Sequence, residues 1–231
     1  PVDYDKSNLA VTKDGAIANG TDYNEFTATI VDAFVNPIAN TTVVFSIINP
    51  DGTTATQTIT TDANGKSVAR VTSTKTGTVT VDAQVTNRSV ANSPATALFV
   101  AGPVDYSKSN LAVTKDNAIA NGTDYNEFTA TIVDAFSNPI TNTAVAFGIT
   151  NPDGTTGTQT INTDANGKSV ARVTSTKAGT VTVDAQVANR SIANSPAKAT
   201  FVIANHISVT KVLDQARVKA GTSTSFTITL T

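Results

Sequence analysis

Hydrophobic and polar residues alternate along much of this chain with a period of two. This period is typical of a strand with one buried face, because successive side chains of a strand point to opposite sides. Three stretches show it clearly, and their apolar faces comprise Phe26, Ala28 and Ile30; Val43, Phe45 and Ile47; and Val79, Val81, Ala83 and Val85. Two further strands are expected within 67–73 and 95–100, and no segment has the apolar stripe of a helix.

Turn sequences separate these strands. Asn49–Thr53 (NPDGT) combines a proline, whose φ is fixed, with a glycine that can adopt a positive φ. Thr61–Lys66 (TDANGK) carries an Asn-Gly pair after Asp, and Val35–Ile38 (VNPI) breaks the chain between two strands. About seven short strands in about 100 residues, with regularly spaced turns, predict an all-β fold, a β-sandwich of the immunoglobulin type.

The whole pattern occurs twice. Residues 1–100 and 103–202 differ at only 15 of 100 positions, and an offset of 102 residues is the length of a domain rather than of a solenoid repeat. We therefore expect two tandem sandwich modules at 1–101 and 103–203. They should sit end to end with limited freedom, because no Gly/Ser-rich hinge separates them. Residues 204–231 weakly resemble the start of a module and are predicted to begin a truncated, diverged third one.

Composition narrows the possible chemistry. The 231 residues include no Cys, no Met, no Trp and a single His, His206. Thiolate nucleophiles and Cys-based metal sites are excluded, and one His cannot build a zinc site or a catalytic triad. Lys and Arg are scattered and the net charge is −2, so nucleic acid is not an expected partner. We expect no cofactor, no catalytic site and no membrane insertion of this fragment.

Two Asp-x-Asn-Gly turns give the best candidate metal sites. Asp62 with Asn64, and Asp164 with Asn166, resemble part of an oxygen-rich calcium loop. Each turn lacks the further acidic ligands and the distal Glu of such a loop. The favoured interpretation is that the Asp caps a turn by accepting backbone hydrogen bonds, and calcium is the alternative.

The differences between the copies bear on partner binding. Many fall between 35 and 48, and several alternate, so they are predicted to lie on the sheet face opposite Val43, Phe45 and Ile47. That face tolerates change and is a poor candidate for a binding site. The unchanged loops 19–25 and 61–66 are better candidates.

Six residues of the first loop and its copy are the candidate partner-binding residues. They are Asn19, Asp22, Tyr23, Asn121, Asp124 and Tyr125. Two other tyrosines, Tyr4 and Tyr106, lie near the module starts and are expected to pack against the neighbouring module.

The stretches LAVTKDGAIANGTDYNEFTATIVDAFVNPIANTTVVFSI and TTDANGKSVARVTSTKTGTVTVDAQV together resemble the bacterial Ig-like domain of group 1. This module is found in tandem in the invasin and intimin family of outer-membrane adhesins. The Leu-x-Val strand, the Asn-Gly-Thr-Asp-Tyr-Asn stretch, the Asn-Pro turn and the Gly-Thr-Val-Thr-Val strand occur in family order in both modules. One loop departs from the family, which commonly has Gly-Asn before this proline; here Val35 and Ser137 replace the Gly.

The resemblance implies an extracellular rod on the bacterial cell surface, within a large adhesin-like protein and without a catalytic site. In the favoured hypothesis the modules are spacers, each adding roughly 30–40 Å, that extend a distal recognition domain. Alternatively, the modules themselves bind a host receptor, a neighbouring bacterium or a surface appendage, with avidity from repetition. An enzyme is the least favoured hypothesis. Adjacent modules of the same chain are expected contacts in any case.

Overall fold

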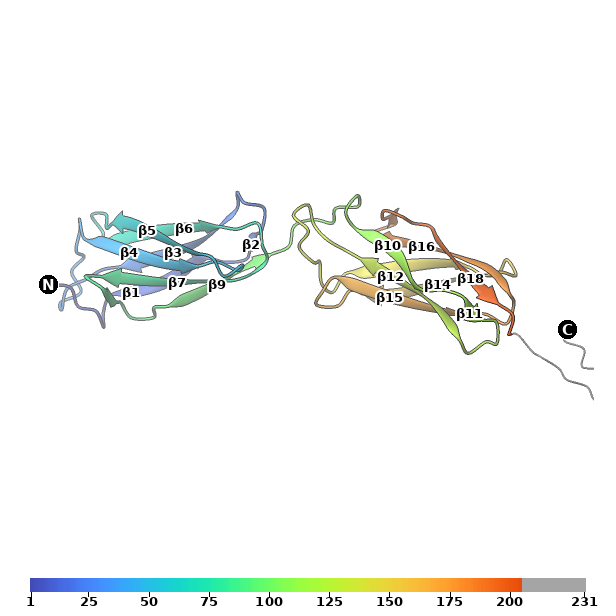
Figure 1. Ribbon diagram of the computed structural model, residues 1–231. Coiled ribbons are helices and arrows are strands. Elements are labelled where there is room, and N and C mark those ends of the chain that lie inside the picture. Colours follow the sequence, from blue (N-terminus) through green and yellow to red (C-terminus); the bar gives the residue numbers. More distant parts are fainter. Residues whose placement is uncertain (205–231) are drawn as a thin grey trace, which may run out of the picture.

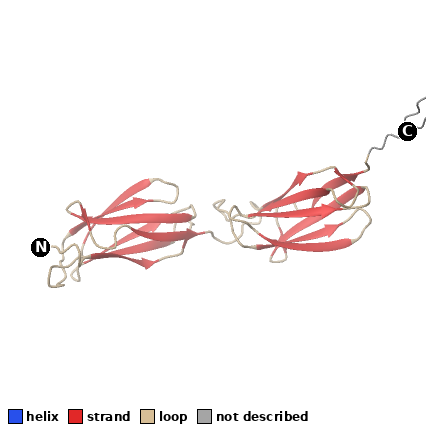
Figure 2. Cartoon of the chain, turned by 90° about the horizontal axis from the view of Figure 1, so that it is seen from below, coloured by secondary structure: helices blue, strands red, loops and turns tan. Residues whose placement is uncertain are grey.

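The computed structural model describes residues 1–204, which form two β-sandwiches joined end to end (Figures 1 and 2). The all-β tandem architecture is confirmed. Within this range no helix has the length and apolar character of a membrane span. The proposed third module beyond residue 204, with His206, lies outside the described residues.

Each module contains seven strands of six to nine residues and two strands of two residues. In module 1 they are β1 (Asn8–Lys13), β2 (Ala16–Ile17), β3 (Tyr23–Thr29), β4 (Thr42–Ile48), β5 (Thr54–Thr60), β6 (Lys66–Thr72), β7 (Gly77–Val85), β8 (Arg88–Ser89) and β9 (Ala95–Val100). In module 2 they are β10 (Asn110–Lys115), β11 (Ala118–Ile119), β12 (Tyr125–Thr131), β13 (Ala144–Thr150), β14 (Thr156–Asn162), β15 (Lys168–Thr174), β16 (Gly179–Val187), β17 (Arg190–Ser191) and β18 (Ala197–Val202).

Two sheets face each other in each module. The smaller has the order β1-β3-β6, and the larger has the order β2-β9-β7-β4-β5, with β8 added beside β7. Neighbouring strands are antiparallel except β2 and β9, which run parallel with Ala16 opposite Phe99. Module 2 repeats both orders with β10 to β18. Each small sheet packs on its large sheet, so one face of every long inner strand is buried.

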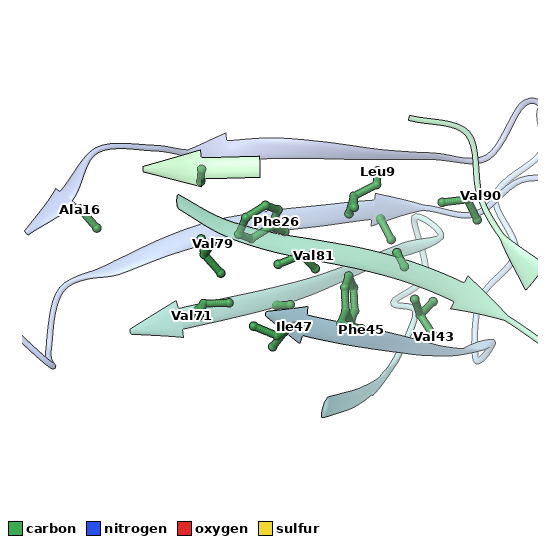
Figure 3. Packing of buried hydrophobic residues seen from close by; sticks show 14 of the residues in the cluster. Leu9, Ala16, Phe26, Val43, Phe45, Ile47, Val71, Val79, Val81 and Val90 are labelled. Atoms are coloured by element: carbon green, nitrogen blue, oxygen red, sulfur yellow. The ribbon is translucent and has the colours of Figure 1, made fainter. Parts of the chain in front are cut away.

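The core consists of the apolar faces that the alternation predicts. Phe26 and Phe45 are 0% exposed and lie between the sheets with Val79 and other aliphatic side chains (Figure 3). Phe99, 1% exposed, belongs to the same cluster. Most of the polar residues that alternate with these core residues are exposed or half-buried, and Thr27, which is 8% exposed, is an exception. Because no disulfide joins the sheets, burial of this apolar surface is the main source of stability.

Strand β5 was not predicted from the sequence. It pairs with the whole of β4, from Thr42 opposite Thr60 to Ile48 opposite Thr54. Its residues are mostly Thr, and both faces are largely solvent-exposed at the edge of the larger sheet. An edge strand with two polar faces has no apolar alternation by which it could be recognised.

A buried asparagine ties the two sheets of each module together. Asn24, on β3, is fully buried; its Oδ1 accepts a hydrogen bond from the Ala16 amide at 3.0 Å and its Nδ2 donates to the Leu98 carbonyl at 3.0 Å. Asn126 makes the equivalent pair in module 2. The side chain thus satisfies backbone groups of β2 and β9 that would otherwise be buried without a partner.

The prediction for Tyr4 and Tyr106 was wrong. The Tyr106 hydroxyl donates to the Val187 carbonyl of its own module at 3.3 Å, its ring packs on that module's core, and the Arg190 guanidinium stacks on it at 4.2 Å. Tyr4 makes the same contacts in module 1. A tyrosine beside a linker has an apolar ring to bury, and here its own core offers the nearer apolar surface.

Candidate functional site

The two unchanged loops lie at opposite ends of each module. Loop 19–25 leads into β3, which begins at Tyr23, and is tied to the end of β6 by a hydrogen bond from the Gly20 amide to the Ser73 carbonyl. Loop 61–66 is tied to the other end of β3 by a bond from the Ile30 amide to the Gly65 carbonyl. A strand of seven residues separates them by about 23 Å. They therefore do not form one site within a module.

Asn19 and Asn121 shape the first loop rather than project from it. The Asn19 Oδ1 accepts hydrogen bonds from the backbone amides of Thr21 at 2.9 Å and Asp22 at 2.7 Å. Asn121 accepts the same bonds in module 2. Such a side chain mimics a turn of the backbone and fixes the loop.

Asp22 and Asp124 are held in ion pairs. The Lys13 ammonium lies 2.5 Å from Asp22 Oδ1, and the Ile17 amide donates to Oδ2 at 2.9 Å. In module 2, the hydrogen bond from the Lys115 ammonium, followed by that from the Ile119 amide, lowers the pKa of Asp124 to about 2. Both carboxylates are therefore ionised at neutral pH and partnered within their own modules.

Tyr23 is part of a surface ladder, which we define as Lys13, Tyr23, Arg70 and Glu25. The Lys13 ammonium lies 4.2 Å and the Arg70 guanidinium 4.8 Å from the ring centre, and Arg70 Nε donates to Glu25 Oε2 at 3.0 Å. Cations over an aromatic face are attracted by its quadrupole. The ladder lies on the small sheet, and its two cations are balanced by two carboxylates, because Glu25 pairs with Arg70 and Asp22 pairs with Lys13.

Module 2 repeats this ladder, with Lys115 and Arg172 at 4.0 and 4.7 Å from the Tyr125 ring centre. Beside it lies an open hollow of about 520 Å³, lined by Glu127, Gln159, Val170 and Arg172. The hollow spans the edge between the two sheets, where Gln159 donates to the Arg172 carbonyl. The structure thus places a small polar depression next to a predicted binding residue.

The two calcium candidates adopt tight turns. Asp62 Oδ1 accepts from the amides of Asn64 at 2.8 Å and Lys66 at 2.9 Å, and Asp164 repeats both bonds. These backbone bonds, led by the one from Lys66, lower the pKa of Asp62. Residues 1–204 contain no group of three or more His, Cys, Asp or Glu side chains placed to hold a metal. Calcium binding at these turns stays the untested alternative.

The contact between the modules centres on a residue that the sequence analysis did not single out. Asn138, in the loop that follows β12, reaches across the junction: its Nδ2 donates to the Thr74 carbonyl at 3.0 Å and its Oδ1 accepts from the Thr76 amide at 3.2 Å. Both partners belong to the β6–β7 loop of module 1. One amide side chain thereby pairs a backbone donor and a backbone acceptor of the preceding sandwich.

Asp134 completes this junction. Its Oδ2 accepts from Asn138 Nδ2 at 2.9 Å and from the linker amide of Gly102 at 2.9 Å. Burial raises its pKa, but the hydrogen bonds from Asn138 and from the amides of Gly102, Asn138 and Phe136 outweigh burial and lower it. Asp134 is 1% exposed, yet its carboxylate remains ionised because three backbone amides and the Asn138 side chain donate to it.

No sequence feature marks this junction as a contact. Asp134 and Asn138 belong to an Asn-Pro turn that reads as a simple break between strands. Their partners at Thr74, Thr76 and Gly102 are backbone groups, which have no side-chain signature. The identity of Asp and Asn in both copies, around a position that varies between Val35 and Ser137, is the only trace in the sequence.

Comparisons with known proteins agree with this architecture. The model of the family described as bacterial Ig-like domain (group 1) matches residues 6–100 and again 108–202. The inverse autotransporter adhesin YeeJ of Escherichia coli (strain K12) is 34% identical over 199 residues, covering 81% of this chain and 8% of YeeJ. Intimin of Escherichia coli O111:H- is 30% identical over 173 residues, covering 73% of this chain and 18% of intimin. The chain thus spans less than a fifth of either relative.

A solved structure shares the fold. Yersinia pseudotuberculosis InvD superposes with a TM-score of 0.68 at 22% identity, over 94% of this chain and 65% of that one. The two family matches fall on the two sandwiches, so the resemblance predicted from the sequence motifs is confirmed. This chain belongs to the bacterial Ig-like domain (group 1) family, as a tandem pair of the modules found in invasin- and intimin-like adhesins.

Proposed function

We propose that the two modules form part of a non-enzymatic stalk of a bacterial cell-surface adhesin, which holds a distal recognition domain away from the cell. The observation that carries this proposal is the junction. Asn138 and Asp134 seat module 2 on the backbone of module 1, so the second sandwich continues the first as an end-to-end rod (Figure 2). A stalk needs such seated joints, because a loose tether would not keep its far end at a distance.

The candidate binding residues support the same role. Asn19 is committed to its own loop, and Asp22 and Tyr23 are paired with Lys13 and Arg70 of the same module. These side chains would have to give up internal partners to bind a ligand. YeeJ, which this chain resembles, is an inverse autotransporter adhesin, and this supports an extracellular place on the cell surface.

The proposal is tested by cell binding. The purified chain is displayed at high density on beads, and the beads are incubated with mammalian and with bacterial cells. The stalk proposal expects no binding above that of bare beads. Saturable binding that soluble chain competes away would contradict it.

Direct binding by the modules is the second candidate function, and the hollow beside the Tyr125 ladder favours it. If the beads bind cells, Arg172→Ala should weaken binding, because it removes a lining residue and a cation from the Tyr125 face. Ile48→Thr is the matched control, since it introduces the residue that module 2 carries at the equivalent, exposed position Thr150. Equal binding by both variants would move the site away from the ladder.

A further inference from the structure

The loop that seats module 2 has a counterpart in module 1 that differs from it only at Val35, which stands opposite Ser137. We name residues 32–37 the entry loop of module 1 and residues 134–139 the entry loop of module 2. Inside the loops the hydrogen bonds agree: Asp32 accepts from Asn36 as Asp134 accepts from Asn138, with 3.0 and 2.9 Å between the side chains. The entry loop of module 1 is therefore already in the conformation that makes the junction.

The two entry loops differ in exposure. Asn138 is 2% exposed, whereas Asn36 is exposed. Phe136 is 41% exposed and Phe34 is 86% exposed. An 86% exposed phenylalanine beside Val35, itself 62% exposed, is an apolar surface that an isolated loop gains nothing by presenting.

The other half of the junction is a backbone surface at the opposite end of a module. We name it the exit loop; in module 1 it comprises residues 74–76 and the linker amide of Gly102. The atoms that Asn138 and Asp134 contact there are the Thr74 carbonyl and the Thr76 and Gly102 amides. Because recognition uses backbone atoms, any module with the same exit-loop conformation offers the same partner, whatever its side chains.

The linker sequence also repeats. Pro1–Tyr4 has the same sequence as Pro103–Tyr106, which follows directly on Gly102. The Asp3 amide bonds the Val31 carbonyl at 2.9 Å, as the Asp105 amide bonds the Val133 carbonyl at 2.9 Å. The first residues of module 1 therefore already follow the path by which a preceding linker would arrive.

From these observations we propose that the entry loop of module 1 is a docking surface for the exit loop of another copy of this module. Asn36 and Asp32 would repeat the contacts of Asn138 and Asp134, and Phe34 would lose exposure as Phe136 does. This inference rests on the proposed stalk function and gives it a molecular rule. Each joint uses one Asp and one Asn on the incoming module and only backbone atoms on the module before it.

The test adds a copy of the module in front of the chain. An unlabelled copy of residues 1–102 is joined to Pro1 of the isotope-labelled chain, which recreates the Gly-Pro-Val-Asp-Tyr linker. The NMR signals of the entry loop of module 1 are compared before and after joining, with the signals of Asn138 in the same spectrum as the docked reference. The expected result is that the Asn36 side-chain amide shifts toward Asn138 and its hydrogen exchange slows by at least about fivefold, since one net hydrogen bond contributes about 1 kcal/mol.

Two controls keep the outcome interpretable. With Asn36→Ala, the Phe34 amide of the joined chain should match that of the unjoined Asn36→Ala chain, which carries the same loss of the Asn36–Asp32 bond, while the core signals stay unchanged because Asn36 is exposed. Unchanged entry-loop signals in the joined chain without substitutions would overturn the proposal. That NMR result would mean that the modules are loosely joined, and it would not affect the bead experiment. Binding of the beads to cells would contradict the stalk proposal, and the NMR experiment would still test docking.

Discussion

The entry loops of the two modules have the same internal structure and different surroundings. Asp32 and Asp134 both cap a turn by accepting hydrogen bonds from the amides two and four residues further on, at 2.9 Å in every case. Only Asp134 also accepts from the linker, and only Asn138 contacts a preceding sandwich. The comparison separates what a module determines by itself from what it gains from its neighbour. Each module determines the conformation of its own entry loop, whereas burial of that loop requires contact with a preceding module.

The hydrophobic cores of the two modules do not differ in their surroundings as the entry loops do. Equivalent core mutations should therefore destabilise the two modules equally. Phe45→Ala and Phe147→Ala remove equivalent side chains that are 0% exposed, and each should destabilise its own module by about 3–5 kcal/mol. Denaturant unfolding followed by per-module hydrogen exchange would measure both effects. Ile48→Thr is the control and should change stability by less than about 0.5 kcal/mol. Unequal effects of the two Phe variants would show that the junction also stabilises the core.

The junction asparagine should give the next largest effect. Asn138→Ala leaves the Thr76 amide and the Thr74 carbonyl without their partner, whereas Asn36→Ala removes only bonds within its own loop. Their difference isolates the contact between the modules and should be about 1–3 kcal/mol. Small-angle scattering would show a less extended particle for Asn138→Ala and no change for Asn36→Ala. Identical scattering of the two variants would mean that the linker alone sets the arrangement.

Both entry loops have a strained backbone at the same position, but the residue that bears the strain differs. Val35 has φ of 66° and Ser137 has φ of 63°, in the left-handed region that costs an ordinary residue about 1–2 kcal/mol and is most unfavourable for a β-branched side chain. The Gly that the family commonly carries here suits this conformation. Val35→Gly should therefore stabilise module 1 by about 1 kcal/mol, and Ser137→Gly should stabilise module 2 by less. Thermal unfolding of each variant checks both, and a destabilised Val35→Gly would show that the side chain has a packing role.

Lowering the pH should have the smallest effect on stability. It should weaken the junction more than the entry loop of module 1. The pKa of Asp134 is lowered, so the stability that its carboxylate contributes is present above about pH 4, the unfolded value, and is lost as pH falls through the folded pKa. The pKa of Asp32 is lowered too, chiefly by the Asn36 side chain, but without the linker bond. Scattering from neutral pH to about pH 2 should show the joint loosening in acid. The Asp134→Asn variant should lack this pH dependence, and a joint unchanged at the lowest pH would contradict the prediction.

The sequence alone predicts those parts of the molecule that have a periodic or repeated pattern. The faces containing Phe26, Phe45 and Val79 follow from alternation, and the tandem arrangement follows from near-identity. Strand β5 was missed because a polar edge strand has no apolar face. The orientation of Tyr106 depends on which apolar surface lies nearer, which only the fold reveals.

The candidate site shows a similar division. Asn19 and Asp22 were singled out because they are unchanged between copies, and the structure accounts for the sameness by loop geometry and ion pairing within the module. Asn138 is just as unchanged and makes the contact between modules. A comparison of two near-identical copies cannot tell residues kept for their role within a module from residues kept for the contact between modules. That contact depends on which loops meet at the junction and on backbone atoms, which leave no trace in the sequence.

The parallel pairing of β2 with β9 has a mechanical consequence. The chain enters each sandwich at one end and leaves at the other (Figure 1). At the end where it leaves, Ala16 of the early strand β2 pairs with Phe99 of the last strand, β9. When the ends of the rod are pulled apart, as by fluid drag on an attached cell, the two strands are drawn past each other. The force then acts along the strands and loads their hydrogen bonds together in shear, instead of opening them one after another. A module of this topology resists traction along the axis in which a stalk would transmit it.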